Sequence, residues 1–413
     1  MIDLAEVLLP RMPTDHSSDI INLALETVRR HLGMDVAYLS EFVGDSLVFR
    51  AVNAPGCEGM IKPGDTRSLD EVFCRDIFAG RLPQLIPDTA AEPIAAAMPI
   101  TQQMPIGSLV SIPIRKDDGS IYGMFCCLSP RASTSLNDRD LAVMQLFSDL
   151  SAAQINQEIR EKHMHQAKLE RIEATIAEQA FSIVFQPIFD LRSMRPAGFE
   201  TLCRFNGEPY RTPDLWFEEA AGLGLGVELE LLVVMMALKA LNTLPSDVYL
   251  SINASPEAVA SGRLGALIAP YDAHRIVLEL TEHAVVENYD RLQAQLFQLR
   301  AIGVQLAIDD AGAGYSGLQH IVRLQPDIIK LDMSLTSHID TDKIRFSLAT
   351  ALVSFANQTG ASIVAEGIET EAELETVAAI GITGGQGFLL GRPAGIEVAL
   401  GLLHYRQNER KGA

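Results

Sequence analysis

Eight acidic residues in the second half of the chain lie at or just beyond the ends of short apolar runs. They are Glu200, Glu279, Glu282, Asp309, Asp310, Asp332, Glu366 and Glu369. The runs have the length and β-branched content of buried parallel strands, as in IVLEL (276–280), VQLAID (304–309), IIKLD (328–332) and SIVAEG (362–367). Carboxylates gathered at strand ends repel one another and lose hydration, so a cation must hold them together. The pattern therefore favours divalent metal ions that act on a phosphate.

The pair Asp309 and Asp310 ends one such run and is followed by the Gly-rich loop AGAGYSG. Adjacent residues at a strand end can direct one carboxylate inward and the next along the rim. Asp309 is therefore predicted to bridge two ions and Asp310 to bind one. Asn253, Glu200 and Glu279 supply further oxygen ligands. An all-oxygen set selects Mg²⁺ or Mn²⁺ over zinc or copper, and two ions about 4 Å apart suit phosphodiester hydrolysis.

Lys330 lies on the run IIKLD, two residues before Asp332. A lone lysine on a strand ordinarily faces solvent or lies at an edge. Here apolar residues flank it and acids recur on neighbouring runs, which favours an inward position among anions. It is predicted to orient the attacking water or to neutralise charge on the phosphate, with Glu366 as a proton acceptor or ligand.

These residues belong to about 225 residues in which predicted strands and helices alternate. The strand candidates are 182–191, 197–205, 248–254, 276–281, 304–309, 328–332, 362–367 and 384–390. Helix starts are predicted at SPEAV (255–259), with a Ser N-cap before Pro, and at Thr370, which forms a capping box with Glu373. The alternation fits a (β/α)8 barrel with some irregularity at its start. In that architecture the carboxyl ends of the strands build the active site, so all eight acids face one mouth.

The first 150 residues predict a smaller α/β domain. Its expected elements are a helix at 19–33, hairpins at 36–43 with 46–52 and at 108–115 with 120–129, and a helix at 136–159. This order implies a sheet with helices on one side. Residues 150–180 predict a long connecting helix, which is either a solvated linker or a dimeric helix that transmits a signal.

The composition is that of a globular protein with more than one domain. The chain has 413 residues, of which 48% are hydrophobic and 21% charged. A formal charge of −20 argues against extensive electrostatic binding to a nucleic-acid polymer. An anionic substrate is still compatible with this charge, because bound metal ions can reverse the sign of the local electric field. Five cysteines form no CxxC pair, so neither disulfides nor zinc are expected. No leader pattern and no bilayer-spanning run are present, so a cytoplasmic location without membrane contact is expected.

The segment FQPIFDLRSMRPAGFETLCRF (185–205) resembles the opening of an EAL domain, the cyclic-di-GMP phosphodiesterase family. SINAS, LELTE, IDDAGAGYSGL, IIKLD, AEGIE and QGFLLGRP follow in the family's order and spacing, so the resemblance covers about 181–405. It implies a TIM-like barrel that linearises cyclic di-GMP to 5′-pGpG with two Mg²⁺ or Mn²⁺ ions. The alternative is a cyclic-di-GMP receptor that does not cleave and acts through a protein partner. The complete set of mutually repelling carboxylates favours catalysis, because without metals they cost stability.

The resemblance also implies roles for single residues. The metal ligands would be Glu200, Asn253, Glu279, Asp309 and Asp310. Lys330 and Glu366 would activate water, Glu282 would hold the loop after the Asp pair, and Glu369 would support the site. Substrate contacts are expected from Gln186, Leu202, Arg204, Asp332, Gln386 and Pro393. The chain departs from the family at Thr201, where alanine is usual, and at Ala311, where phenylalanine is common.

The N-terminal half resembles a GAF domain, a sensory module, in its order of elements and in FCRDIFAGRLPQLIPDT (73–89). The expected limits are 15–155 for this module, 156–180 for the linker helix and 181–405 for the EAL domain. The resemblance implies regulation of the barrel and a candidate small-molecule ligand for the module. A homodimer is expected from the EAL family and from the helical linker. Cys74 is either a bilin attachment or redox site or a buried side chain on a helix, and the frequent burial of free cysteine favours the second.

Overall fold

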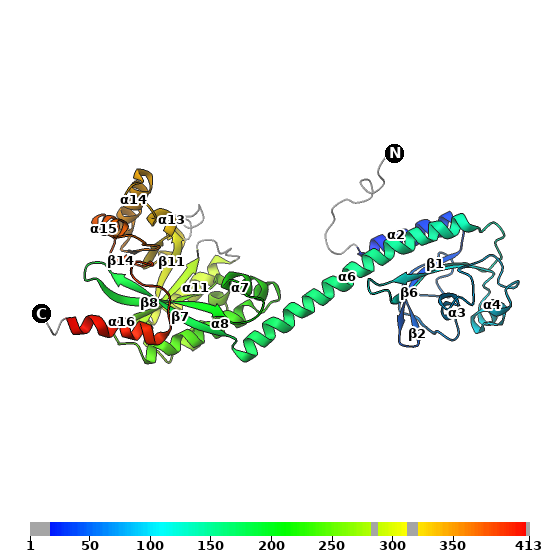
Figure 1. Cartoon of the computed structure of the whole chain (residues 1–413), viewed down its shortest axis with the longest axis horizontal. Helices are drawn as coiled ribbons and strands as arrows, with labels where there is room; N and C mark the ends of the chain where they lie inside the picture. The colour runs from blue at the N-terminus through cyan, green and yellow to red at the C-terminus, as the bar shows by residue number, and fades with distance from the viewer. Residues whose placement is uncertain (1–16, 282–287, 312–320, 410–413) are drawn as a thin grey trace. The chain divides into compact units, whose positions relative to one another are not determined.

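The computed structural model describes residues 17–281, 288–311 and 321–409. It divides into two compact units, Met1–His165 and Gln166–Ala413, and Figure 1 shows the elements of each. The limit between the units falls within helix α6 (Asp138–Glu178). The helix predicted at 136–159 and the connecting helix predicted at 150–180 are therefore one continuous helix. Among the described residues, no helix combines the length and the apolar character needed to span a membrane.

The first unit is built on a six-stranded antiparallel sheet in the order β3-β2-β1-β6-β5-β4. The strands are β1 (Val36–Val43), β2 (Ser46–Asn53), β3 (Thr66–Ser68), β4 (Leu85–Ile86), β5 (Ser108–Arg115) and β6 (Ile121–Ser129). The two predicted hairpins, β1 with β2 and β5 with β6, are confirmed. Their turns contain Gly44 and Gly119, whose positive φ angles of 60° and 82° suit glycine.

Helices cover both faces of this sheet, so the prediction of helices on one side only is wrong. Helix α2 (Ser17–His31) and helix α6 cover one face, where Leu25 and Met144 pack against Leu39. The other face is covered by α3 (Cys74–Phe78), α4 (Pro93–Ala97) and α5 (Pro99–Gln103). These helices have five residues each, which is too short for an apolar periodicity to show in the sequence.

The buried cysteines of this unit serve packing. Cys74 is 2% exposed and packs with Cys126 on one face of the sheet, whereas Cys127 belongs to the core on the opposite face. A hydrogen bond with Cys126 and burial raise the pKa of the Cys74 thiol well above its usual value. Cys74 is thus the buried side chain that the sequence favoured over an attachment or redox site.

The second unit is a closed barrel in the strand order β10-β11-β12-β13-β14-β7-β8-β9. The strands are β7 (Phe181–Asp190), β8 (Arg195–Phe205), β9 (Tyr249–Asn253), β10 (Ile276–Thr281), β11 (Gln305–Ala311), β12 (Ile328–Leu331), β13 (Ser362–Ala365) and β14 (Gly384–Gly385). Neighbours from β8 round to β14 run parallel, whereas β7 is antiparallel to both β8 and β14. The predicted barrel is confirmed, and its irregular start is this reversed first strand.

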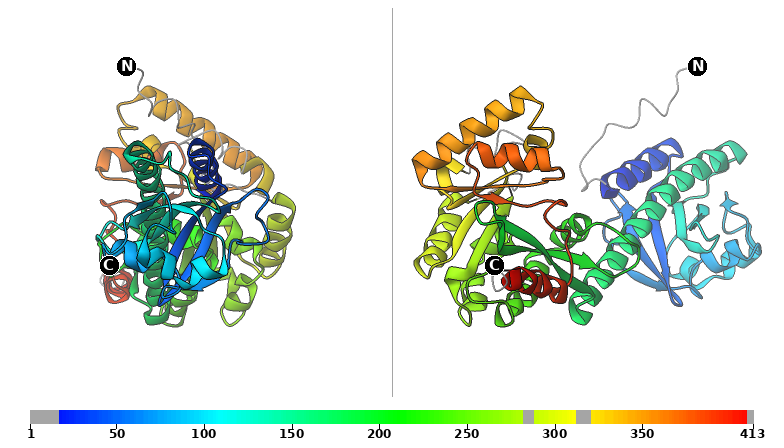
Figure 2. Two further views of the ribbon diagram at one scale, coloured as in Figure 1. Left: turned by 90° about the vertical axis from the view of Figure 1, so that its right-hand side faces the viewer. Right: turned by 60° about the vertical axis from the view of Figure 1, so that its left-hand side comes forward.

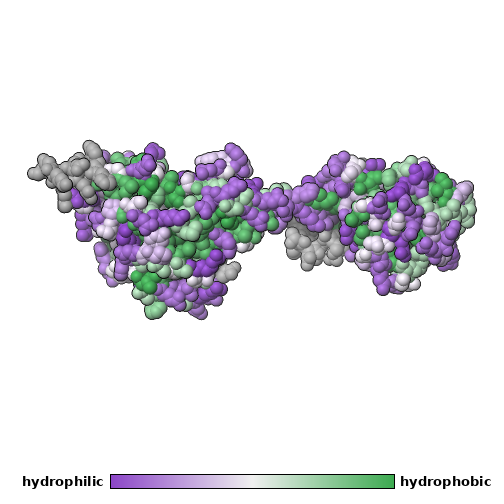
Figure 3. Space-filling view, turned by 90° about the horizontal axis from the view of Figure 1, so that it is seen from below, coloured by the Kyte–Doolittle hydropathy of each residue, from purple (hydrophilic) through white to green (hydrophobic). Residues whose placement is uncertain are grey.

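Helices surround the barrel, as Figure 2 shows from two further directions. They are α7 (Pro213–Gly222), α8 (Gly226–Leu238), α9 (Pro256–Ala260), α10 (Leu264–Ile268), α11 (Tyr289–Ala301), α13 (Met333–Thr336), α14 (Lys343–Thr359), α15 (Glu371–Ala379) and α16 (Ile396–Glu409). Ser255 caps α9, and the capping box of Thr370 with Glu373 starts α15, as predicted. On the face of the chain seen in Figure 3, polar and apolar side chains are intermixed.

The strand predicted at 384–390 is wrong beyond Gly385. After that residue the backbone N–H groups of Leu390 and Gly391 donate to the carbonyl of Gly387 instead of to a neighbouring strand. The chain also passes close to its neighbour, because a Cβ atom at Gly387 would lie 2.1 Å from the backbone oxygen of Ile368. This run therefore forms a turn packed against backbone, although its composition resembles that of a strand.

Inside the barrel, side chains form two layers. The lower layer is apolar and contains Ile188, Tyr249, Val277, Ala307, Ile328 and Val364. Because strand side chains alternate with a period of two, the next inward position on each parallel strand lies nearer its carboxyl end. Those positions are polar, namely Glu200, Ser251, Glu279, Asp309, Lys330 and Glu366. The acids and the lysine therefore form one polar layer directly above the apolar layer of the barrel interior.

Candidate active site

Lys330 is surrounded by four carboxylates. Its Nζ lies 2.7 Å from Glu366 Oε1, 2.9 Å from Glu279 Oε2, 3.0 Å from Asp309 Oδ1 and 3.5 Å from Glu200 Oε2. The side chain is 1% exposed. Burial alone would lower the pKa of Lys330, but the four carboxylates together raise it well above its usual value. The lysine therefore carries a buried positive charge, in the inward position that the sequence predicts.

Five acids form what we call the carboxylate cluster: Glu200, Glu279, Asp309, Asp310 and Glu366. Oxygens of Glu200, Glu279 and Asp309 lie within 4.8 Å of one another, and so do oxygens of Asp309, Asp310 and Glu366. Asp309 belongs to both groups. One ammonium against five ionised carboxylates leaves a formal charge of −4, which two divalent cations would balance. The all-oxygen donor set fits Mg²⁺ or Mn²⁺.

A bulge at the end of β11 brings two successive carboxylates into this cluster. An extended strand would direct the side chains of Asp309 and Asp310 to opposite faces. Here the register between β11 and β12 shifts between Ile308 and Ala311, and Asp310 has a φ angle of +57°. A bulge with a left-handed residue redirects a side chain, so both acids reach Glu366. Such a backbone conformation is uncommon for aspartate and is typical of functional sites.

Neutral groups hold two of the acids in place. Glu200 accepts hydrogen bonds from Asn253 Nδ2 at 3.2 Å and from Gln386 Nε2 at 2.6 Å. Glu279 Oε1 accepts one from the Ser251 hydroxyl at 2.5 Å. Each carboxylate therefore keeps a defined orientation in addition to its contact with Lys330.

The ionisation of the acids differs because their partners differ. Burial opposes ionisation of Glu200, but Lys330, Gln386 and Asn253 together lower its pKa. Burial raises the pKa of Glu279 well above its usual value, and Glu200 and Asp309 add to this effect against the opposing charge of Lys330. Burial likewise raises the pKa of Glu366 to about 8, despite the contact with Lys330. Acids with such different proton affinities in one site are typical of catalytic centres.

Gln386 connects the cluster to β7. Its Nε2 group also donates to Gln186 Oε1 at 3.0 Å, and Gln186 Nε2 donates to the backbone oxygen of Gly391 at 3.3 Å. Gln386 is 4% exposed, and its Oε1 atom has no hydrogen-bond partner within the described part of the chain. A buried carbonyl oxygen without a donor is a further group that a bound cation or water can satisfy.

The other predicted substrate residues lie at different depths. Leu202 and Pro393 are half-buried, whereas Arg204 is exposed and donates through Nη1 to the backbone oxygen of Cys203 at 2.8 Å. Leu202, Arg204 and Asn253 line a cavity of about 250 Å³, and Asn253 connects it to Glu200 of the carboxylate cluster through the hydrogen bond at 3.2 Å. Asp332 caps helix α13 by accepting from the Ser334 N–H at 2.9 Å. Its carboxylate thus has a structural contact that the sequence did not suggest.

Two predicted catalytic residues are not among the grouped acids of the described part of the chain. Glu369 is exposed, and its backbone N–H donates to Glu373 Oε2 at 3.0 Å. Glu282 lies outside the residues that the structure describes. Their expected roles stay predictions.

Two polar residues near the site were not predicted, namely Ser251, which contacts Glu279, and Glu230, which lines the cavity beside Leu202. Ser251 stands two residues before Asn253, so the period of a strand could have placed it on the inner face. Glu230, on α8, accepts a hydrogen bond from the Ser255 N–H at 2.7 Å and lines the same cavity as Leu202. Burial raises the pKa of Glu230. A single acid on a helix carries no sequence signal for such a contact.

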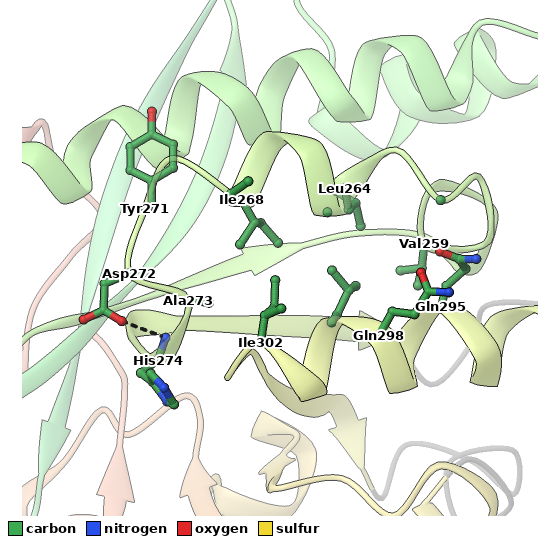
Figure 4. A pocket seen from close by; sticks show the side chains of 14 residues that line it. Val259, Leu264, Ile268, Tyr271, Asp272, Ala273, His274, Gln295, Gln298 and Ile302 are labelled. Carbon is green, nitrogen blue, oxygen red and sulfur yellow. Dashed lines mark hydrogen bonds between the residues drawn. The ribbon is translucent and has the colours of Figure 1, made fainter.

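A larger cavity, of about 530 Å³, lies between α10 and α11 and is shown in Figure 4. Side chains such as Leu264, Ile268 and Ile302 make its lining mainly apolar. Its acid, Asp272, accepts a hydrogen bond from the backbone of His274 at 3.1 Å. Within the described ranges, the groups of acids able to hold an ion lie in the barrel and not in this cavity. The chemistry of the side chains therefore identifies the barrel mouth as the candidate active site.

The chain thus forms a (β/α)8-type barrel whose strands carry, at their carboxyl ends, a cluster of acids that could hold metal ions. A sequence model of the EAL domain matches residues 169–393, and one of the GAF domain matches residues 17–155. Because the first match covers more than half of the chain, the chain belongs to the EAL domain family. Its N-terminal part is a GAF domain.

Curated relatives resemble the EAL part. Cyclic di-GMP phosphodiesterase PdeF of Escherichia coli K12 is 28% identical over 239 residues, which are 55% of this chain and 32% of PdeF. The probable cyclic di-GMP phosphodiesterase PdeN of the same organism is 29% identical over 235 residues, which are 54% of this chain and 45% of PdeN. The chain spans about a third of the length of the first curated relatives that it matches.

Solved structures agree with this fold. The PaMucR phosphodiesterase in complex with c-di-GMP is 27% identical with a TM-score of 0.51, covering 56% of this chain and 99% of that one. The EAL enzyme Bd1971, bound to cAMP and cyclic di-GMP, covers 90% of this chain and 93% of its own, with a TM-score of 0.55. At 18% identity, Bd1971 supports the fold alone.

Proposed function

We propose that this chain is a phosphodiesterase that hydrolyses cyclic di-GMP to 5′-pGpG. The observation that carries the proposal is the buried Lys330 among the carboxylates, with two overlapping groups of oxygens beside it. The names of PdeF and PdeN and the nucleotide complex of PaMucR support this choice of substrate. The alternative, a receptor that binds cyclic di-GMP without cleaving it, would have little use for acids that repel one another.

Two Mg²⁺ or Mn²⁺ ions are the proposed cofactors. The proposed ligands are Glu200, Asn253, Glu279, Asp309 and Asp310. When bound, the ions would act as Lewis acids that make water more nucleophilic and stabilise the departing oxygen. The place of Asp309 in both oxygen groups supports a bridging role, and Asp310 belongs to one group only.

In the proposed reaction the oxygen of water bonds to phosphorus, the bond from phosphorus to the 3′ oxygen breaks, and this oxygen takes a proton. Glu366 is proposed to accept the proton of the water, with Lys330 holding its carboxylate at 2.7 Å. Arg204, exposed beside the cluster, is proposed to bind a phosphate through its planar guanidinium. Glu282 and Glu369 are proposed to support the site. The remaining proposed substrate contacts are Gln186, Leu202, Asp332, Gln386 and Pro393.

The GAF domain is proposed to regulate hydrolysis, with residues 156–180 as the connecting segment, and the chain is proposed to form homodimers in the cytoplasm. Apolar residues on α2 and α6 support a dimer, because Ile20, Leu23, Leu146 and Leu150 are 51–64% exposed at helical spacings. The C-terminal end of α6 packs on the barrel, which supports transmission of a signal along this helix. Ile172 is fully buried against Phe205 of β8, the strand that also carries Glu200.

The direct test is to incubate the purified chain with cyclic di-GMP and Mg²⁺ or Mn²⁺ and to separate the products by chromatography. We expect 5′-pGpG, and none from Glu279→Gln, which removes a proposed ligand. Ca²⁺ is larger and loosely coordinated, so it should support binding but little cleavage. Nucleotide binding without any product would favour the receptor.

A further inference from the structure

Ser251 lies between two strands that carry proposed metal ligands. It is on β9, is 1% exposed, and pairs in register with Glu200 on β8 and Val277 on β10. Its hydroxyl donates to Glu279 Oε1 at 2.5 Å. The other oxygen of that carboxylate, Oε2, lies 2.9 Å from Lys330 Nζ. The two oxygens of Glu279 are thus held from opposite sides, by β9 and by β12.

Thr201 forms a hydrogen bond to the same residue, Ser251, from the outer face of the barrel. It follows Glu200 on β8 and is buried, and its hydroxyl donates to the backbone oxygen of Ser251 at 2.9 Å. Alanine, the residue usual in the family at this place, could not make this bond. The chain Thr201 to Ser251 to Glu279 therefore links three adjacent strands through side-chain hydroxyl groups, next to Glu200 and Asn253.

We propose that Ser251 and Thr201 are positioning residues that orient the Glu279 carboxylate for metal binding. The proposal rests on the metal site of the proposed function. A carboxylate held by Lys330 alone would turn toward the ammonium and lose the orientation in which it shares its oxygens with Glu200 and Asp309. Groups that orient a metal ligand commonly contribute 10- to 100-fold to metal affinity, so their effect is measurable without substrate.

The test measures Mn²⁺ binding to the full chain, without nucleotide, from the electron paramagnetic resonance signal of free Mn²⁺. Ser251→Ala should raise the dissociation constant about 10- to 100-fold. Thr201→Val keeps the shape of the side chain and removes one neutral hydrogen bond, so about a 2- to 10-fold rise is expected. Thr201→Ser keeps the hydroxyl and should restore affinity.

Two matched controls exist in the chain. Ser151 and Thr336 are buried, and their hydroxyl groups have no hydrogen-bond partner within the described residues. Ser151→Ala and Thr336→Val repeat the same chemical changes away from Glu279 and should leave Mn²⁺ affinity unchanged. Thermal unfolding in EDTA identifies any variant that does not fold. If Ser251→Ala does not fold, Thr201→Val tests the positioning role, because valine preserves the shape of the threonine side chain.

The outcomes separate the two proposals. If the wild-type chain and Glu279→Gln bind Mn²⁺ equally weakly, the metal site of the proposed function fails. If the wild-type chain binds Mn²⁺, Glu279→Gln does not, and Ser251→Ala and Thr201→Val both bind within twofold of wild type, the positioning role is overturned. A loss in Ser251→Ala and Thr201→Val with recovery in Thr201→Ser supports it.

Discussion

Lys330 is a single buried cation beside acids that cannot all be ionised without a counter-charge. It contacts carboxylates from four different strands or strand ends, at β8, β10, β11 and β13. Its ammonium group therefore both stabilises the cluster and fixes the orientation of Glu366. Nucleotide binding is proposed to depend on Arg204 rather than on Lys330. A substitution of Lys330 should therefore affect the carboxylate cluster and leave nucleotide binding in place.

Lys330→Met should retain nucleotide binding and lose most turnover, by about 100- to 1,000-fold, the range for removal of one preorganised electrostatic group. Binding is measured by calorimetry in Ca²⁺ and turnover by chromatography in Mg²⁺. The control is Lys343→Met, a change of an exposed lysine on α14. A Lys330→Met variant with wild-type turnover would remove the role assigned to this residue.

The sequence predicted Lys330, Glu279 and Asp309 because each lies in or at the end of a short, mainly apolar run typical of a strand that is buried on both faces. It did not predict Ser251 as a partner of Glu279, or the bond from Thr201. Those contacts depend on which residues of adjacent strands lie side by side, and a single sequence does not contain that register. Asp332 shows the same limit, since its position at a strand end fits a site residue while its carboxylate caps α13.

Among the elements, β10 to β13 were predictable because their runs are apolar and β-branched, whereas for β14 the start at Gly384 was predicted and the end at Gly385 was not. Its strand bonds involve two glycines, and close neighbours decide where it ends. The short helices α4 and α5 were missed for a related reason, since tertiary packing rather than periodicity stabilises them, whereas α3 was expected as the helix that carries Cys74. Local pattern thus predicts the long, buried elements, and packing determines the short ones.

The turn after β14 yields a prediction on stability. Gly387→Ala should destabilise the barrel by about 1–3 kcal/mol or more, because the added Cβ would meet the backbone of Ile368, which cannot move aside as a side chain can. Gly395→Ala is the control, since a Cβ there would meet nothing within 4 Å. Urea unfolding measures both. Equal stability of the two variants would show that the turn can adjust to the added Cβ atom without a loss of unfolding free energy.

Glu373 holds the loop that follows Glu366, and this predicts a pH dependence. Its carboxylate accepts hydrogen bonds from the backbone N–H groups of His338, Glu369 and Thr370 at 2.8–3.0 Å. Burial opposes ionisation, but these bonds lower the pKa of Glu373 below its ordinary 4.5. A lowered folded-state pKa means that the stabilisation is present above pH 4.5 and disappears as the pH falls through the folded value.

Glu373→Gln should therefore cost about 1.5–3 kcal/mol at pH 7, the range for hydrogen bonds to a charged group. The difference in unfolding free energy from wild type should stay constant from pH 8 to about pH 5 and shrink below that. Glu371→Gln, a change of an exposed acid in the same helix, is the control. A difference that persists unchanged at about pH 3 would show that ionisation of Glu373 does not contribute.

At the scale of the whole molecule, the two units have separate cores. The sheet of the first unit is enclosed by two apolar clusters of its own, and the barrel has a larger cluster around its strands and another within them. The carboxylate cluster lies in the second unit only. Binding of metal ions should consequently stabilise one unit and leave the other unchanged.

Scanning calorimetry of the full chain should resolve two transitions, of which Mg²⁺ raises one. With free ion at about 100 times its dissociation constant, mass action adds about 2.7 kcal/mol, which for a unit of this size corresponds to about 5–10 °C. The shift should vanish in Glu279→Gln, whereas Glu41→Gln in the GAF unit should preserve it. A rise of both transitions would mean that the cores do not unfold separately. No rise in either would mean that the acids do not hold metal, because ions that bind only the native barrel must stabilise it.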